Sequence, residues 1–414
     1  MSFSEWREVK LEELTSEIFS GGTPTTSNID FWDGQNNWLS SGETRNKFIT
    51  FTEKTITDLG VKNSSTRLAK KNDVIIASAG QGHTRGQTSL CKIDTYINQS
   101  LISIRANSNF LNPHFLFYNL SNRYDELRQL SDGNSIRGSL TTRLIKALKF
   151  YLPPIREQQA IAATLYCLDE KIELNKRINK NLEEMIQAIF KSWFNDFEPF
   201  QDGEFEDSKL GRIPKGWRVK SLEEYVISID NRGKTPPLST QMTPYPIIDV
   251  KALSGDSRII NYNNCTKYVE EEIYNNWFRS GHPMQKDILI STVGSLAEMK
   301  IFFGDKGCIA QNVVGLRSKN ISPLYLYQYL QNIKEDLISY NIGSVQPSIK
   351  VTHIIKHKIL IPSDKALKEF ETIINEISNM ILKNHEETQT LTQIRDILLP
   401  KLMSGEIRVP IEEV

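Results

Sequence analysis

Residues 155–195 read IREQQAIAATLYCLDEKIELNKRINKNLEEMIQAIFKSWFN, and apolar side chains recur in this stretch at alternating steps of four and three residues. This spacing places them on one stripe of an α-helix and is typical of the a/d seam of a coiled coil. We therefore predict one long helix, about 60 Å in length at 1.5 Å per residue. The seam positions are Ile161, Leu165, Leu168, Ile172, Asn175, Asn179, Leu182, Ile186, Ile189 and Trp193.

A second helix with the same seam is predicted 209 residues further along the chain. Both seams turn polar at the same two places, Asn175 and Asn179 in the first helix and Asn384 and Thr388 in the second. A polar layer of this kind can fix the register of two helices, or it can simply tolerate solvent. The second seam consists of Phe370, Ile374, Ile377, Ile381, Asn384, Thr388, Leu391, Arg395, Leu398 and Leu402.

The blocks that precede the helices are also repeated, so the chain is predicted to be a tandem duplication. Asp73–Gly80 aligns without gaps on Asp287–Gly294, and each segment has the pattern of an apolar strand ended by glycine. The other matched segments are Trp6–Glu13 with Trp217–Glu224, Gly22–Pro24 with Gly233–Pro236, and the capped helix starts Asn112-Pro113 with Ser322-Pro323.

The order block, helix, block, helix predicts the architecture. Because the first helix leads from one block to the next and the second returns, the helices are expected to run antiparallel. The expected fold class is α/β plus long helices, with two duplicated mixed α/β domains joined by an antiparallel coiled coil and related by a pseudo-twofold axis. We place the first domain at residues 1–152, the central helix at 153–198, a linker and the second domain at 199–362, and the C-terminal helix and tail at 363–414.

The composition is that of a globular protein, with 414 residues of which 39% are hydrophobic and 24% charged. No uncharged apolar run reaches the ~18 residues of a membrane span, and the polar first ten residues predict no secretory signal and a cytoplasmic location. The four cysteines are scattered without a C-x-x-C pair, which favours reduced thiols over disulfides or zinc. His353 and His357 lack an accompanying ligand pattern, so no metal is expected.

The net charge of zero conceals a partition along the chain. Residues 1–154 and 215–362 carry net charges of +3 and +5, and the remaining segments carry −8 in total. Two basic segments in an otherwise acidic chain would suit phosphate binding. The same charge distribution is also expected of an ordinary solvated surface that binds no phosphate.

Three motifs suggest nucleotide or methyl-donor chemistry, and each is incomplete. Gly80-Gln81-Gly82 lacks the third glycine of a dinucleotide loop, because Arg85 stands there. Gly233-Lys234-Thr235 has Ser228 where a phosphate loop needs glycine. Asn112-Pro113-His114-Phe115 resembles the Asn-Pro-Pro-Phe/Tyr signature of amino-methyltransferases but has histidine for the second proline. We therefore predict no catalytic site and no cofactor in this chain.

Several segments closely resemble the DNA-specificity subunit of type I restriction-modification systems, and the similarity extends over almost the whole chain. They are Leu152–Gln159, Leu210–Trp217, and Leu398–Leu402 with Ser404–Ile407. The second helix departs from the family pattern, because its entry reads Pro362-Ser363-Asp364 without a Glu-Gln pair.

The resemblance implies two target recognition domains, each reading one half of a split site in double-stranded DNA, with helices between them that act as a ruler. It also implies two methyltransferase subunits as partners and two restriction or translocase subunits in the full complex. S-adenosylmethionine, ATP and Mg would then belong to those partners.

The duplication suggests which residues contact DNA, because surface shared by both copies suits the DNA backbone and surface that differs suits base reading. The stretches that do not align are residues 25–66 and 237–282, with the turns after Gly80 and Gly294. Cationic and amide side chains there match guanine and adenine edges. The predicted base-reading residues are Arg45, Asn46, Lys47, Gln81, His83 and Arg85 in the first domain and Lys251, Arg258, Ser295 and Lys300 in the second. The predicted backbone contacts are Gly22, Thr23, Arg137, Gly233, Lys234, Thr235 and Gln346, all in turns that both copies share.

For every one of these residues, an ordinary surface or strand-ending role is the alternative. Two rival functions also stay open. One is a self-sufficient DNA methyltransferase or nuclease, which the incomplete motifs disfavour. The other is a two-headed scaffold that binds only proteins. Measuring DNA binding with and without a methyltransferase partner separates these readings.

Overall fold

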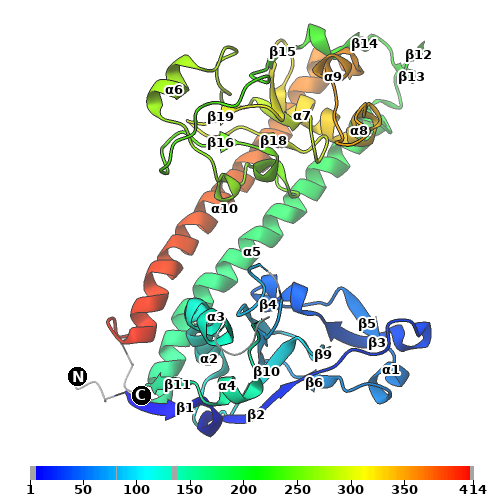
Figure 1. The fold of residues 1–414 in the computed structure, drawn as a ribbon. Helices are drawn as coiled ribbons and strands as arrows, with labels where there is room; N and C mark the ends of the chain where they lie inside the picture. Colours follow the sequence, from blue (N-terminus) through cyan, green and yellow to red (C-terminus); the bar gives the residue numbers. More distant parts are fainter. Residues whose placement is uncertain (1–5, 81, 133–137, 411–414) are drawn as a thin grey trace. The chain divides into compact units, whose positions relative to one another are not determined.

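The computed structural model of the chain describes residues 6–80, 82–132 and 138–410. It divides into two compact units: unit 1 comprises Met1–Glu173 with Gln389–Val414, and unit 2 comprises Leu174–Thr388. Both boundaries fall inside the long helices α5 (Ile155–Phe194) and α10 (Asp364–Ser404), which are drawn in Figure 1. Each long helix therefore contributes one segment to each unit.

Unit 1 is built on a five-stranded sheet in the order β2-β10-β7-β8-β4, in which β4 pairs parallel with β8 and the other pairs are antiparallel. A four-stranded sheet, β5-β3-β9-β6, and the pair β1-β11 complete it. The strands are β1 (Arg7–Lys10), β2 (Thr15–Ser20), β3 (Trp32–Leu39), β4 (Phe48–Ile49), β5 (Lys54–Ile56), β6 (Arg67–Ala69), β7 (Val74–Ala77), β8 (Thr88–Cys91), β9 (Thr95–Ile97), β10 (Leu101–Ala106) and β11 (Lys149–Leu152). The short helices are α1 (Asp58–Lys62), α2 (Pro113–Asn122), α3 (Tyr124–Asp132) and α4 (Thr142–Lys146).

Unit 2 is built on a four-stranded antiparallel sheet in the order β15-β20-β17-β18. Three two-stranded pairs, β12-β13, β14-β21 and the parallel β16-β19, surround it. The strands are β12 (Phe205–Ser208), β13 (Gly211–Pro214), β14 (Arg218–Ser221), β15 (Val226–Ile229), β16 (Ile247–Ile248), β17 (Ile288–Ser291), β18 (Met299–Ile301), β19 (Cys308–Ile309), β20 (Val313–Ser318) and β21 (Lys358–Ile361). The short helices are α6 (Glu271–Asn276), α7 (Pro323–Asn332), α8 (Lys334–Ser339) and α9 (Val351–Lys356).

The predicted duplication is confirmed by the strand pairing. In unit 1, β1 pairs with β11 and β7 with β10, and in unit 2 the same pairings join β14 to β21 and β17 to β20. The predicted helix starts are also confirmed, because Asn112 caps α2 and Ser322 caps α7 with proline at the first turn. Each of these helices has ten residues and ends at an asparagine, Asn122 or Asn332.

A buried ion pair sits at the same place in both central sheets. Arg105 of β10 contacts Asp73 at 2.8 Å, and Arg317 of β20 contacts Asp287 at 2.7 Å. Each aspartate is 2% exposed and stands just before the buried strand, β7 or β17. The two aspartates align in the sequence. Nothing in the sequence indicates that arginines of β10 and β20, three strands further along the chain, are their partners.

The long helices belong to the hydrophobic core of each unit. Ile161 of α5 and Leu402 of α10 join the core of unit 1, while Phe190 of α5 and Phe370 of α10 join that of unit 2. Every predicted seam position of both helices is buried or half-buried. The apolar stripe is therefore at least half-buried at each predicted position, and its two ends contribute to the two cores.

Within unit 2, polar seam residues connect α5 to α10. Asn175 Nδ2 donates to Glu387 Oε2 at 2.8 Å, and Asn179 Nδ2 donates to the Ile381 carbonyl at 3.0 Å. Asn384 Nδ2 donates to Asn179 Oδ1 at 2.9 Å, and Thr388 is half-buried in the same stretch. Because the α10 partner number falls as the α5 number rises, the two segments run antiparallel here.

The two units differ where the sequences do not align. Residues 25–66 form β3, β4, β5 and α1, so that unit 1 has its separate four-stranded sheet. Residues 237–282 form β16 and α6 together with short 3₁₀ turns. The same scaffold thus carries two different insertions.

Candidate DNA interface

Several turns of unit 1 converge where β7 ends and β10 begins. The Gly22 N–H donates to the Ile97 carbonyl at 3.0 Å, which joins the turn after β2 to the segment before β10. Thr44 Oγ1 donates to Gln87 Oε1 at 3.2 Å and joins the 3₁₀ turn Ser41–Arg45 to the turn after β7. We call residues 21–23, 41–46, 82–87 and 97–100 the turn end of unit 1.

The corresponding turns converge in unit 2. The Thr292 N–H donates to the Asn312 carbonyl at 2.8 Å, and the Gly294 N–H donates to the Pro347 carbonyl at 3.0 Å. These bonds join the turn after β17 to the start of β20 and to the loop before α9. We call residues 233–235, 292–295, 311–312 and 346–349 the turn end of unit 2.

A threonine–glutamine pair occupies the same place in both turn ends. Thr23 Oγ1 donates to Gln99 Oε1, and Gln311 Nε2 donates to Thr235 Oγ1. Both glutamines are exposed, so the pairs add little to the core, and Thr and Gln are among the side chains that bind DNA phosphates. Neither glutamine was predicted from the sequence, although an Ile-x-Gln motif precedes both β10 and β20.

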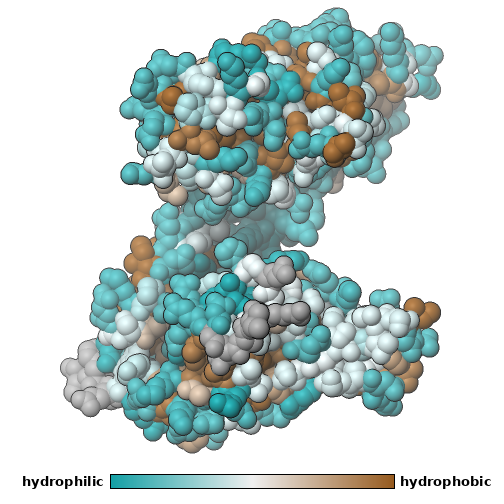
Figure 2. All heavy atoms as spheres, in the orientation of Figure 1, coloured by the Kyte–Doolittle hydropathy of each residue, from teal (hydrophilic) through white to brown (hydrophobic). Residues whose placement is uncertain are grey.

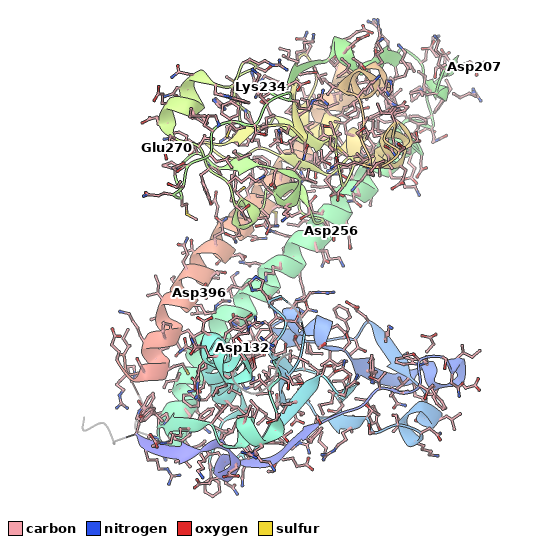
Figure 3. All side chains as sticks on the ribbon, in the orientation of Figure 1. Asp132, Asp207, Lys234, Asp256, Glu270 and Asp396 are labelled. Atoms are coloured by element: carbon pink, nitrogen blue, oxygen red, sulfur yellow. The ribbon has the colours of Figure 1, made fainter. Side chains whose placement is uncertain are left out.

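Most of the other predicted contacts are solvent-accessible. Figure 2 shows hydrophilic residues over much of the visible face of each unit, and Lys234 is labelled in Figure 3. In the turn end of unit 1, Arg45 pairs with Glu53 at 2.5 Å while remaining exposed. Lys251 is exposed on the 3₁₀ turn Val250–Leu253, outside the turn end. The exposed or half-buried predicted residues of the turn ends are Thr23, Arg45, Asn46, His83, Gly233, Lys234, Thr235, Ser295 and Gln346.

Two predicted contacts of unit 1 are committed to internal packing. Gly22 was expected to offer its N–H to a phosphate, but this N–H donates to Ile97, and an added Cβ would lie 2.1 Å from Ser65 Oγ. Glycine is therefore required here for close packing. Arg85 is 8% exposed and its guanidinium pairs with Asp132 of α3. That geometry anchors the turn rather than presenting the side chain to a base.

Three predicted base-reading cations contact groups of their own unit instead of standing free at the surface. Lys47 Nζ lies 2.5 Å from Asp169 of α5, and burial lowers the pKa of this lysine. Arg258 is 0% exposed and bonds to Glu183 of α5. Lys300 is 1% exposed and donates to backbone carbonyls, and burial lowers its pKa to about 8. Arg258 and Lys300 are buried charges that need such partners, so neither side chain is presented to a base edge, whereas Lys47 is half-buried.

Two further predicted residues, Gln81 and Arg137, lie outside the described residues. Across residues 6–80, 82–132 and 138–410, no group of three or more His, Cys, Asp or Glu side chains is placed to hold a metal ion. In the same described ranges, no helix combines the length and the apolar character needed to cross a membrane.

The duplicated scaffold matches a known family twice. A family model described as the type I restriction modification DNA specificity domain matches residues 3–184 and again residues 214–395. The chain belongs to this family. The two matches begin 211 residues apart, so the specificity domain itself is the duplicated unit, and each copy extends into a long helix.

Relatives of this specificity family align over nearly the full chain. The type I restriction enzyme MjaIX specificity subunit of Methanocaldococcus jannaschii is 27% identical, covering 98% of this chain and 94% of its own. The type I restriction enzyme HindI specificity subunit of Haemophilus influenzae is 25% identical, covering 98% and 100%. The crystal structure of a type I restriction-modification S subunit from M. genitalium shares the fold, with a TM-score of 0.56, 18% identity and coverage of 97% and 96%.

Proposed function

We propose that this chain recognises a bipartite DNA site and directs methyltransferase subunits, and restriction subunits in the full complex, to that site. The observation that carries this proposal is the double match to the DNA specificity family, one match in each half of the chain. The two turn ends support it further, because each presents the same Thr–Gln pair among side chains that differ.

Residues 1–152 and 199–362 would be the two recognition domains, and residues 153–198 and 363–414 the helices that separate them. In this proposal α5 and α10 form an antiparallel coiled coil with pseudo-twofold symmetry. Support comes from the covered seam and from the Asn175, Asn179 and Asn384 hydrogen bonds, which hold one register in unit 2.

Contacts with DNA would divide into two classes. The shared pairs Thr23–Gln99 and Thr235–Gln311, with the exposed Gly233-Lys234 turn, would bind phosphates. The side chains that differ would read bases in the major groove. On the side of unit 1 these are Arg45, Asn46 and His83, and on the side of unit 2 they are Lys251 and Ser295; the exposed Gln346 would join the phosphate contacts.

Catalysis would lie outside this chain. Two methyltransferase subunits would supply S-adenosylmethionine and the transfer chemistry, and two ATP-dependent restriction subunits would join them. The Gly233-Lys234-Thr235 turn supports this division, since Thr235 is tied to Gln311 and the turn leads into no helix that could cradle a phosphate chain.

A gel shift with purified components tests the proposal. The chain and a cognate methyltransferase subunit should together bind DNA carrying the site and transfer methyl groups to it, and the chain alone should transfer none. Sequencing of methylated bases in cells with and without the gene should give one split motif that depends on this chain. Methyl transfer by the pure chain, or an unsplit motif, would contradict the proposal.

A further inference from the structure

A cation stands at the same structural position in both units, immediately before the outer edge of the central sheet. Lys47 precedes β4, whose Phe48 pairs parallel with Leu90 of β8. Arg258 precedes Ile259, which bridges parallel to Ile301 of β18. Each cation is followed by the residue that joins the sheet, so the two positions are equivalent although their flanking sequences were read as unalignable.

Both cations leave the sheet and contact a carboxylate on α5. Lys47 Nζ lies 2.5 Å from Asp169 Oδ2. Arg258 donates to Glu183 from Nε at 3.0 Å and from the terminal nitrogen at 2.8 Å, and its backbone N–H donates to the same carboxylate at 3.0 Å. The two contacts lie in different units, so each fold is fastened to its own segment of α5.

Each contact also includes α10. Asp169 Oδ1 accepts a hydrogen bond from Arg395 at 2.9 Å, and Arg258 donates to Ser378 Oγ at 2.8 Å. Asp169 and Ser378 are 209 residues apart, which is the repeat distance of the helices. Lys47 and Arg258 therefore contact equivalent positions of the two repeated helices, Asp169 of α5 and Ser378 of α10. Through these contacts each cation connects its own unit to segments of both α5 and α10.

Surrounding groups hold these contacts in one geometry. The Tyr118 hydroxyl of α2 donates to Asp169 at 2.5 Å. The amine of Lys300 donates to the carbonyls of Gly255 and Ser257, which fixes the turn that delivers Arg258 to α5. Asp256 of that turn is labelled beside α5 in Figure 3.

Buried ion pairs of this kind contribute little net stability, because desolvation of the charges offsets their attraction. What a bidentate arginine–carboxylate contact does supply is a fixed orientation, since two parallel hydrogen bonds define an angle. Arg258 with Glu183 has this geometry at 0% and 8% exposure. Retention of a cation at both equivalent positions favours a role in orientation.

We propose that Lys47 and Arg258 are positioning residues that fix the angle of each recognition fold on the helix pair and thereby restrict the spacer length between the two half-sites. Arg258 does so through its bidentate contact with Glu183. Lys47 does so through the Asp169 carboxylate, which Tyr118 and Arg395 also bind. The inference rests on the proposed function. A recognition domain whose angle to the helices is not fixed would still read its bases. It would, however, accept a half-site displaced by one base pair.

The decisive variant removes both charges of the bidentate pair, Arg258→Met with Glu183→Leu, and is compared with the charge exchange Arg258→Glu with Glu183→Arg. Lys180 and Glu184 form an exposed ion pair on the same helix at 3.9 Å, so Lys180→Met with Glu184→Gln is the matched control. Each variant is expressed with the methyltransferase subunit, and methylated motifs are sequenced.

The pair-removing variant should keep both half-sequences and should methylate sites with a spacer one base pair longer or shorter roughly tenfold more than the unaltered chain does, a factor equivalent to about 1.4 kcal/mol. The charge exchange should restore the narrow spacer, and the control should not change it. Arg258→Lys keeps the charge but loses the bidentate geometry, so it should broaden the spacer even where the double variant fails to fold.

Two results would overturn the inference. One is an unchanged spacer in active Arg258→Lys and pair-removing variants. The other is a uniform loss of methylation at all sites without broadening, which indicates a purely structural role. Failure of the proposed function looks different, because the unaltered chain would then give no split motif in the first place.

Discussion

Lengthening both long helices by one turn should lengthen the unread spacer of the DNA site. The change duplicates residues 174–177 in α5 and residues 380–383 in α10. The contacts of Asn175 with Glu387 and of Asn179 with Ile381 then stay on their own sides of the inserted turns. The Asn384–Asn179 hydrogen bond crosses the insertion and is lost, at a cost of about 1 kcal/mol.

The size of the effect follows from helix geometry. Four added residues lengthen a helix by about 6 Å and turn the chain by about 40° beyond a full circle. Two base pairs lengthen DNA by about 7 Å at ~3.4 Å per step and turn it by roughly 70°. The mismatch in rotation is therefore about 30°, small enough for the proposed coiled coil to absorb by local unwinding. The four-residue variant should act on sites with one or two more spacer base pairs.

A seven-residue insertion in each helix is the matched control. It adds about 10 Å, or three base pairs, but rotates the helix by almost a whole number of turns, whereas the DNA turns by over 100°. This variant should be less active than the four-residue variant on every spacer. Motifs are read by sequencing methylated bases in cells. An active four-residue variant that keeps the original spacer would refute the idea that these helices measure the DNA.

Three further predictions concern single sites. Glu183→Leu alone should destabilise the protein by about 3–5 kcal/mol in chemical denaturation, because it leaves the charge of Arg258 buried without its partner; adding Arg258→Met should recover most of this loss, and equal stability of the two variants would contradict the reasoning. Burial lowers the pKa of Lys300 to about 8 from 10.5, so between these pH values the amine is neutral when folded and protonated when unfolded. The stability of the unaltered chain relative to Lys300→Met should therefore rise with pH through this window, and a flat difference would exclude the shift. Thr23→Val with Gln99→Leu should weaken binding to matched and unrelated DNA alike, by roughly tenfold for two lost phosphate hydrogen bonds, in competition gel shifts with Thr26→Val as control; selective loss on the matched site would assign the pair to base reading.

The repeated scaffold was predictable from sequence because it is encoded locally. The strands β7 and β17 are short apolar runs ended by glycine, and the caps of α2 and α7 are single residues before proline. The long helices are predicted by apolar side chains at alternating steps of four and three residues, a spacing that persists over ten seam positions. None of these signals depends on which other part of the chain lies nearby.

The site was harder to predict because side-chain type does not reveal burial. Lys47 and Arg258 have the chemistry of guanine-reading residues, yet their partners on α5 lie 122 and 75 residues away in sequence. A cation that docks a fold on a distant helix looks the same in sequence as one that faces DNA. The signal that could have separated them is their spacing of 211 residues, which matches the offset of the first strands of the two copies.

Gly22 and Gln99 also show that the sequence does not reveal which polar groups are already used inside the protein. A Gly-Thr turn suggests exposed N–H groups, but the Gly22 N–H is already used by Ile97 across the turn end. The exposed polar group at this place is the side chain of Gln99, in a segment that the alignment of the two halves had not singled out.

The central claim, that each half of the chain reads one half of the DNA site, is tested most directly by exchanging residues 1–152 for the same block of a related specificity subunit. The chimera is expressed with the methyltransferase subunit, and the methylated motif is determined by sequencing modified bases. The account predicts that one half-sequence changes to that of the donor, while the other half-sequence and the spacer stay as they were. A motif in which both halves change, or neither, would contradict it.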